Sequence, residues 1–101
     1  MSDQHERARQ LVAEARSAEQ RGQTTRALSL YNDALSRFDE GSQDQLYADT
    51  LRWKGTVLRE RGETDEAYRC YTGSLTVAER SEAIGSQAHA LNCLAIIAQR
   101  R

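Results

Sequence analysis

Apolar side chains recur every three or four residues along nearly the whole chain, and the sequence contains no proline. This spacing places apolar side chains on one face of an α-helix, and the residue that most strongly breaks helices is missing. The pattern therefore predicts an all-α fold of five helices joined by short connections. The apolar stripes of the first two helices are Ala8, Leu11, Val12, Ala15 and Ala18, followed by Ala27, Leu28, Tyr31, Ala34, Leu35 and Phe38.

Glycine and threonine mark two of the predicted helix boundaries. Gly22 is expected to end a first helix over about 3–21, because glycine tolerates the left-handed conformation after a helix C-terminus. Thr24 then offers a side-chain oxygen to cap the second helix. Gly62 and Thr64 repeat this arrangement between the third and fourth helices, so two tight helical hairpins are predicted.

Longer connections are predicted where a glycine precedes a serine, at Gly41-Ser42-Gln43 and at Gly85-Ser86-Gln87. In each, glycine would end one helix and serine would cap the next. The two segments lie forty-four residues apart, about one helical turn more than a period of forty. We therefore expect the second helix to be a turn shorter than the fourth, and the third a turn longer than the fifth.

Eight residues are repeated forty positions later. The identical pairs are Ala8/Ala48, Leu11/Leu51, Arg21/Arg61, Gly22/Gly62, Thr24/Thr64, Ala27/Ala67, Tyr31/Tyr71 and Leu35/Leu75. A third copy begins in the same register with Ala88 and Leu91. Repetition at this period is typical of stacked helical hairpins. Residues 1–101 are thus predicted to form one domain, with a first repeat at about 3–41, a second at about 42–82, and a half repeat or capping helix at about 86–101.

One repeat position is always small: Ala15, Gly55 and Ala95 lie forty residues apart. Small side chains let two helices approach closely. We expect the ring of Tyr31 or Tyr71 to fill the space beside each close approach.

Composition and charge narrow the range of functions. Hydrophobic residues make up 39% of the chain and charged residues 29%, with a net charge of −1, so the broad basic surface of a nucleic-acid-binding protein is not expected. No apolar run is long enough to span a bilayer, and the polar first ten residues lack the apolar stretch of a secretory signal. We therefore expect no nucleic-acid partner, no membrane partner and a cytoplasmic location.

Residues that could carry chemistry are scattered. His5 and His89 stand outside the spacings of metal and catalytic motifs, and Cys70 and Cys93 form no CxxC pair. His89 and Cys93 are four residues apart on one predicted helix and could share a metal ion, but no third ligand stands nearby in the sequence. We predict that the chain is not an enzyme and has no cofactor and no metal site.

The repeated pattern resembles the tetratricopeptide repeat, in which the first helix carries large residues around a small one and the second carries Ala, an aromatic residue, Ala and Leu. The matching residues are Leu11, Ala15, Ala18, Gly22, Ala27, Tyr31, Ala34 and Leu35 in the first repeat, Leu51, Gly55, Leu58, Gly62, Ala67, Tyr71, Ser74 and Leu75 in the second, and Leu91, Leu94, Ala95 and Ala98 in the third. The likeness covers nearly the whole chain. Glu14 and Lys54 stand where the family prefers leucine, and the period is forty rather than the commoner thirty-four, which looks like a longer-helix variant of signalling scaffolds.

The resemblance implies an antiparallel stack of helical hairpins, a right-handed solenoid, that binds a protein or peptide in a concave groove. Carried over by position, the groove residues are Arg9, Val12 and Arg16 in the first repeat, Asp49, Arg52, Thr56 and Arg59 in the second, and His89, Asn92 and Ile96 in the third. Four guanidinium groups in this groove would grip the carboxylates of an acidic peptide. Alternatively, these charges simply form a solvated helix face.

The fifth helix is among the most aliphatic segments, and the sequence offers it no partner helix. Either a longer repeat array continues beyond it, or two copies of the chain form a symmetric dimer. The residues expected at this surface are Leu94, Ile97, Ala98 and Arg101.

The sequence therefore predicts a non-catalytic protein-interaction or scaffold module that binds a peptide or partner segment. One alternative is the N-terminal sensory or regulatory segment of a larger signalling or transcription-regulating protein. A homodimerisation module acting through the C-terminal helix is the other.

Overall fold

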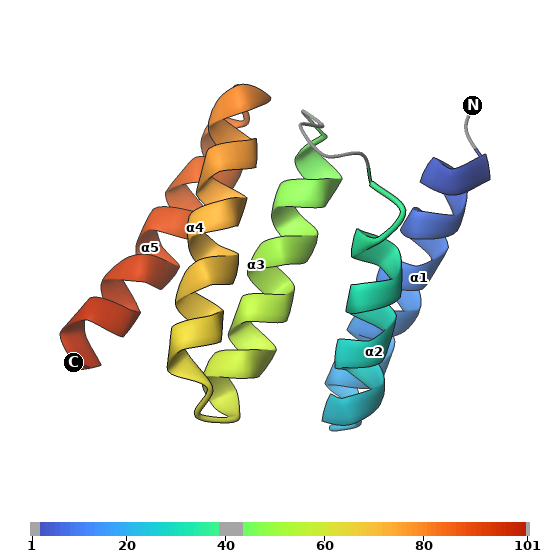
Figure 1. Cartoon of the computed structure of the whole chain (residues 1–101), viewed down its shortest axis with the longest axis horizontal. Helices are drawn as coiled ribbons and strands as arrows, with labels where there is room; N and C mark the ends of the chain where they lie inside the picture. Colours follow the sequence, from blue (N-terminus) through green and yellow to red (C-terminus); the bar gives the residue numbers. More distant parts are fainter. Residues whose placement is uncertain (1–2, 39–43, 101) are drawn as a thin grey trace. The chain divides into compact units, whose positions relative to one another are not determined.

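The computed structural model describes residues 3–38 and 44–100 of the chain. Within these ranges all regular secondary structure is helical and falls into five segments (Figure 1). The helices are α1 (Asp3–Gln20), α2 (Thr24–Leu35), α3 (Gln45–Glu60), α4 (Thr64–Arg80) and α5 (Ile84–Arg100). The predicted all-α fold with five helices is confirmed.

The chain divides into two compact units. Unit 1 (Met1–Glu40) contains α1 and α2, which run antiparallel (Figure 1). Unit 2 (Gly41–Arg101) contains the antiparallel pair α3 and α4, with α5 packed on α4 and touching α3. Across the described residues, no helix is both long enough and apolar enough to cross a membrane.

The core of unit 1 forms from the stripes that periodicity predicts. Its buried residues are Ala8, Leu11, Val12, Ala15 and Ala18 of α1 and Ala27, Tyr31 and Ala34 of α2. The ring of Tyr31 is fully buried, and its hydroxyl donates a hydrogen bond to the Glu19 carboxylate. Burial and this carboxylate raise the pKa of Tyr31 above its ordinary value.

Unit 2 builds the same kind of core between α3 and α4. Gly55 packs so tightly that a Cβ atom there would lie 2.8 Å from Cε1 of Tyr71, which confirms the expected close approach at this position. The hydroxyl of buried Ser74 donates a hydrogen bond to the carbonyl of Ala48, with 2.7 Å between the oxygens. Since Ser74 lies on α4 and Ala48 on α3, a side-chain to backbone bond joins the two helices inside the core.

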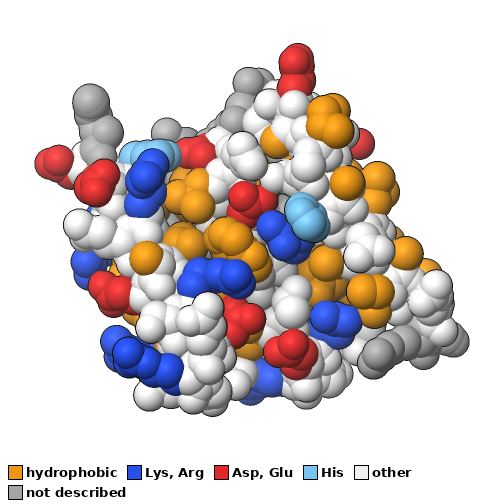
Figure 2. All heavy atoms as spheres, turned by 180° about the vertical axis from the view of Figure 1, so that it is seen from behind, with side chains coloured by type: hydrophobic (Ala, Val, Ile, Leu, Met, Phe, Trp, Pro, Cys, Tyr) orange, Lys and Arg blue, Asp and Glu red, His pale blue; other side chains and the backbone are white. Residues whose placement is uncertain are grey.

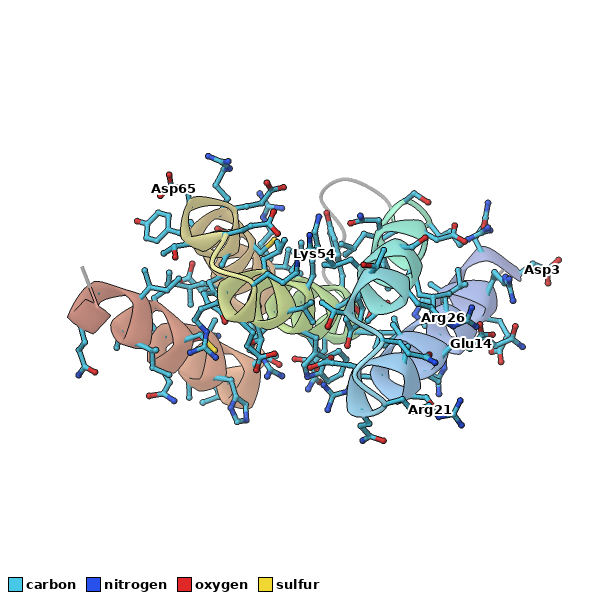
Figure 3. The ribbon with its side chains drawn as sticks, turned by 90° about the horizontal axis from the view of Figure 1, so that it is seen from below. Asp3, Glu14, Arg21, Arg26, Lys54 and Asp65 are labelled. Carbon is cyan, nitrogen blue, oxygen red and sulfur yellow. The ribbon has the colours of Figure 1, made fainter. Side chains whose placement is uncertain are left out.

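Glu14 and Lys54, the charged residues at positions where the resemblance leads us to expect leucine, are not among the buried core residues. Glu14 is exposed on α1, and Lys54 is half-buried on α3. Figure 3 labels both residues, together with Arg21 and Arg26 of unit 1 and Asp65 of unit 2. Neither charged side chain is therefore fully enclosed in the core of its unit.

Gly22 and Gly62 form the predicted hairpin turns, with φ of +76° and +86°. In each, the residue after the glycine donates its N–H back across the turn, from Gln23 to Ala18 and from Glu63 to Leu58, at 2.9 Å in both cases. A backbone hydrogen bond to the carbonyl five positions earlier, around a residue with positive φ, is the Schellman motif that commonly ends helices.

The predicted threonine caps are wrong. Thr24 and Thr64 are already the first residues of α2 and α4, and the N-cap residues Gln23 and Glu63 make no side-chain capping bond. The turn is too short to leave the threonines outside the helix, because the next helix begins two residues after each glycine.

A third turn of the same kind joins α4 to α5, at a place that the sequence does not mark. Glu82 takes the left-handed conformation, with φ of +55°, and Ala83 N–H donates to the carbonyl of Ala78 at 3.0 Å. Gly85 and Ser86 therefore lie inside the first turn of α5, and the predicted connection at Gly85-Ser86-Gln87 is wrong. The matching connection at 41–43 lies outside the described residues.

Helix lengths follow from these turns. The second helix is shorter than the fourth, as expected, with 12 residues against 17. The third is not longer than the fifth, since α3 has 16 residues and α5 has 17. The reason is the early start of α5, directly after the turn at Glu82.

The early start of α5 also changes which of its residues are buried. Ala88, Leu91 and Ala95, the residues in register with the first two repeats, are exposed. Ala90 and Ile97 are buried instead, two residues later than Ala88 and Ala95. Each residue turns a helix by about 100°, so this displacement carries the forty-residue stripe to the outer side of α5. The predicted register of the third copy, with Ala95 at a close approach, is therefore wrong.

Candidate functional site

Four polar side chains lie along one face of α3, which we call the α3 polar face: Asp49, Arg52, Thr56 and Arg59. Their spacing of three, four and three residues follows the helical period. All four are half-buried, beside the buried residues Ala48 and Gly55. These are the residues predicted to line the groove in the second repeat, and the structure brings them together on unit 2.

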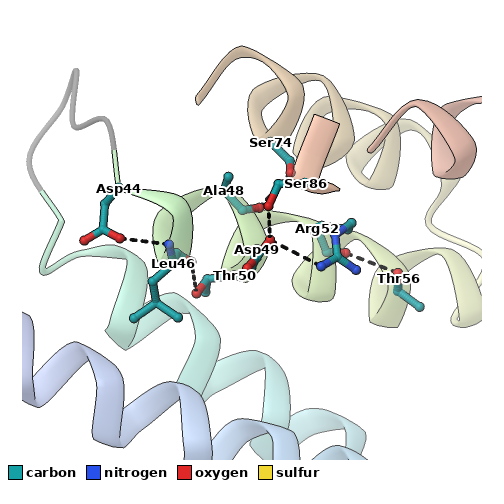
Figure 4. A network of polar contacts seen from close by, with 9 residues as sticks. All are labelled: Asp44, Leu46, Ala48, Asp49, Thr50, Arg52, Thr56, Ser74 and Ser86. Atoms are coloured by element: carbon teal, nitrogen blue, oxygen red, sulfur yellow. Dashed lines mark hydrogen bonds and ion pairs between the residues drawn. The ribbon is translucent and has the colours of Figure 1, made fainter. Parts of the chain in front are cut away.

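Asp49 connects α3 to α5. The hydroxyl of Ser86, in the first turn of α5, donates to Oδ1 of Asp49 at 2.8 Å, and Nη2 of Arg52 lies 3.3 Å from the same oxygen (Figure 4). Ser86 is buried. The sequence suggested a capping role for this serine, and only its helical register reveals that it faces Asp49.

Thr56 connects α3 to α4. Its hydroxyl lies 3.2 Å from the carbonyl oxygen of Arg52 and 2.9 Å from the hydroxyl oxygen of Tyr71, with which it forms a hydrogen bond. Burial raises the pKa of Tyr71, while Thr56 and Arg59 oppose this rise. The α3 polar face is therefore held in place from both neighbouring helices, by Tyr71 of α4 and Ser86 of α5.

Arg52 and Arg59 each keep an unsatisfied donor. The Nε atoms of both side chains are buried and have no hydrogen-bond partner among the described residues. A buried donor without an acceptor costs about 1–3 kcal/mol. Since each guanidinium carries five N–H groups, this face has donor capacity that the chain's own acceptors leave unused.

The aromatic ring of Trp53 adds to the surroundings of Arg52. Cζ of Arg52 lies 5.4 Å from the centre of that ring, within the range of a cation–π interaction. The ring and Asp49 together orient the guanidinium without using all of its donors.

The predicted groove residues of α5 differ from the α3 polar face in how far they are exposed. His89 and Asn92 are exposed and Ile96 is half-buried. Among the described residues, the hydrogen bond from α5 to the α3 polar face comes from Ser86. Ser86, which the sequence predicted as a helix cap, is therefore the residue of α5 that contacts this face.

The predicted groove residues of the first repeat lie on α1, in unit 1. Arg9 is exposed, and Arg16 is half-buried with Nη1 3.7 Å from Oε1 of Glu19. Val12 is only 4% exposed, so little of its side chain is accessible to a ligand, and its place in a groove stays a prediction. It lies next to Leu11, and the buried stripe of α1 is wide enough to include both.

The residues predicted for a dimer or continuation surface differ in how far they are exposed. Ile97 is only 2% exposed, Leu94 is half-buried, and Ala98 is exposed. Arg101 lies outside the described residues. The exposed large side chains of α5 are instead Ile84 and Leu91, at 71% and 54%, because the register of the helix differs from the one predicted.

Cys70 and Cys93 are free thiols. Burial raises the pKa of the Cys70 thiol. Within residues 3–38 and 44–100, no three His, Cys, Asp or Glu side chains cluster in a way that could hold a metal ion.

Comparisons of the chain with protein-family models, with curated proteins and with solved structures found no match. The feature of this chain that bears on its function is therefore the α3 polar face.

Proposed function

We propose that this protein is a non-catalytic interaction module of the tetratricopeptide type, whose α3 polar face binds an acidic segment of a partner protein. The observation that carries the proposal is the pair of half-buried arginines, Arg52 and Arg59, whose Nε donors have no acceptor among the described residues. The recurrent helical turns and the close approach at Gly55 support the family assignment, and a right-handed solenoid is part of the proposal.

The spacing of the two arginines suggests the form of the ligand. They are seven residues apart on one helix, which corresponds to about 10 Å along its axis. Two carboxylates three residues apart on a peptide in the polyproline II conformation project from the same side and are separated by a similar distance, about 9 Å. A segment with two glutamates in this spacing would therefore place one carboxylate at each guanidinium.

Charge-assisted bonds provide the binding energy. Arginine binds carboxylates through two parallel N–H donors, and Asp49 takes up part of the capacity of Arg52. A ligand that draws each guanidinium outward would also supply acceptors for the unused Nε donors. Binding of this kind weakens as salt screens the charges.

A cytoplasmic location belongs to the same proposal. It is supported by the two free cysteines, Cys70 and Cys93, since exported proteins more often pair their cysteines in disulfides.

The test compares Arg52→Gln with Arg59→Gln, singly and together, and uses Arg69→Gln as the matched control. Arg69 is exposed on α4 of the same unit, so its substitution removes the same charge from a different surface. The probe is a fluorescent peptide with two glutamates three residues apart, and a second peptide carries glutamines instead. Fluorescence anisotropy measures the affinity, and circular dichroism checks that each variant is folded.

We expect the glutamate peptide to bind, and each single substitution at the α3 polar face to weaken binding about tenfold. This corresponds to the loss of a charge-assisted bond of about 1.5 kcal/mol. The Arg69→Gln variant should bind as the parent does. Equal affinity for the glutamine peptide, or unchanged affinity in the double variant, would contradict the proposal.

A further inference from the structure

An exposed apolar stripe runs along α5 in unit 2, and it plays no part in the function proposed above. The α5 stripe consists of Ile84, Ala88, Leu91, Ala95 and Ala98. All five residues are exposed, and their spacing of four, three, four and three residues places them on one helical face. Figure 2 shows hydrophobic side chains along the edge of unit 2 that α5 forms, at the right of that view.

The stripe lies opposite the face by which α5 packs in unit 2. Cys93, which is half-buried, follows Leu91 by two residues and so lies about 160° around the helix from it. Buried Ala90 and Ile97 lie on the same inner side. The α5 stripe is therefore not used by the packing of its own unit.

The absence of charged residues along α5 argues against an acidic partner, the kind proposed for the α3 polar face. Residues 84–99 contain no Asp, Glu, Lys or Arg, although charged residues make up 29% of the chain. A charged partner would find no opposite charge along this segment, and desolvating its own charges would oppose binding. Two such segments can meet without repulsion between like charges.

The sizes of the side chains point to one specific partner. Leu91 is at the centre of the stripe, with a large residue seven positions before it, Ile84, and a small one seven positions after it, Ala98. In an antiparallel pair of α5 helices related by a two-fold axis at Leu91, Ile84 of one copy would lie opposite Ala98 of the other. Ala88 would lie opposite Ala95, within one helical rise of about 1.5 Å.

We infer that a second copy of this chain docks on the α5 stripe and forms an antiparallel symmetric dimer. A two-fold interface must be complementary to itself, and this stripe meets that condition in charge and in size. The alanines on both sides of Leu91 allow the two helices to approach closely. This surface lies on α5 and the proposed peptide site on α3, so either proposal can fail without the other.

The test is sedimentation equilibrium of the whole chain from about 1 μM to about 1 mM, a range that covers weak dimers, under reducing conditions. We expect a concentration-dependent equilibrium between monomer and dimer. Leu91→Arg should weaken the dimer at least tenfold, because one substitution places two charges at the two-fold axis. Thr76→Arg is the matched control, since Thr76 is exposed on α4, and it should change the dissociation constant less than twofold.

A second variant separates close packing from unspecific hydrophobic association. Ala95→Leu enlarges the apolar surface but adds a bulky side chain where the helices would approach, so it should also weaken the dimer. Circular dichroism of both variants should match the parent, as the substituted side chains are exposed. The inference is overturned if the chain stays monomeric throughout the range, if Leu91→Arg leaves association unchanged, or if Ala95→Leu strengthens it.

Discussion

The turn at Glu82 provides a direct test of where α5 begins. Glu82 is the residue other than glycine that has positive φ in the described part of the chain, at +55°. In the equivalent turns this position is Gly22 or Gly62, at +76° and +86°. The proposed perturbation is Glu82→Gly.

The expected change in the free energy of unfolding follows from the backbone conformation alone. A residue with a side chain pays roughly 1–2 kcal/mol in the left-handed conformation, and glycine avoids this penalty. Glycine also gains freedom in the unfolded chain, which offsets about 0.5–1 kcal/mol. We expect Glu82→Gly to stabilise unit 2 by about 0.5–1 kcal/mol, which would raise its melting temperature by several degrees.

Two further variants replace glycine by alanine, one in an equivalent turn and one inside α5. A Cβ atom at Gly62 would meet nothing within 4 Å, so Gly62→Ala should destabilise unit 2 by about 1 kcal/mol through backbone strain. Gly85 has similarly open space but lies within α5, so Gly85→Ala should stabilise by roughly 0.5–1 kcal/mol, because alanine favours the helix.

Urea and thermal unfolding followed by circular dichroism measure all three variants. Gly22→Ala, in unit 1, identifies the transition that belongs to that unit if the two units unfold separately. A lower stability of Glu82→Gly would refute a strained left-handed turn at Glu82. A lower stability of Gly85→Ala would refute the start of α5 at Ile84, since it would mean that Gly85 ends a helix and that α5 begins after it.

Two other predictions concern the core tyrosines. Gly55→Leu should destabilise unit 2 by about 1–3 kcal/mol, because the first added carbon would already lie 2.8 Å from Tyr71 and 3.1 Å from Cβ of Cys70. An unchanged midpoint of urea unfolding would contradict the packing described for Gly55. Burial and Glu19 raise the pKa of Tyr31, so the unfolded chain loses this proton first, near pH 10, and stability should fall as pH rises above that value. Tyr31→Phe should reduce this alkaline loss in urea titrations at successive pH values, and an unaltered pH dependence would count against the assignment.

Much of the fold was predictable because it depends on local rules. The three and four spacing of apolar residues correctly located the buried stripes of α1 and α2, since a helix brings those positions onto one face. Gly22 and Gly62 marked two turns because glycine adopts positive φ without steric cost. The same periodicity placed Asp49, Arg52, Thr56 and Arg59 on one face of α3 before their neighbours were known.

The arrangement of α5 was decided by tertiary structure. Glu82 carries no sequence signal for a left-handed turn, whereas Gly85 and Ser86 look like a helix boundary. Packing of Ala90 and Ile97 inside unit 2 selects a register in which the turn falls at Glu82, and the residues that repeat at forty positions then face outward.

The contacts of the α3 polar face also required the folded chain. Ser86 and Tyr71, which hold Asp49 and Thr56, lie thirty-seven and fifteen residues away from them in the sequence, and no local pattern specifies such pairs. The sequence by itself determined the helices, two of their turns and the residues that share the polar face of α3, because these depend on backbone geometry over a few residues. Tertiary packing alone decided the register of α5, and with it which side chains anchor the α3 polar face and which form the exposed α5 stripe.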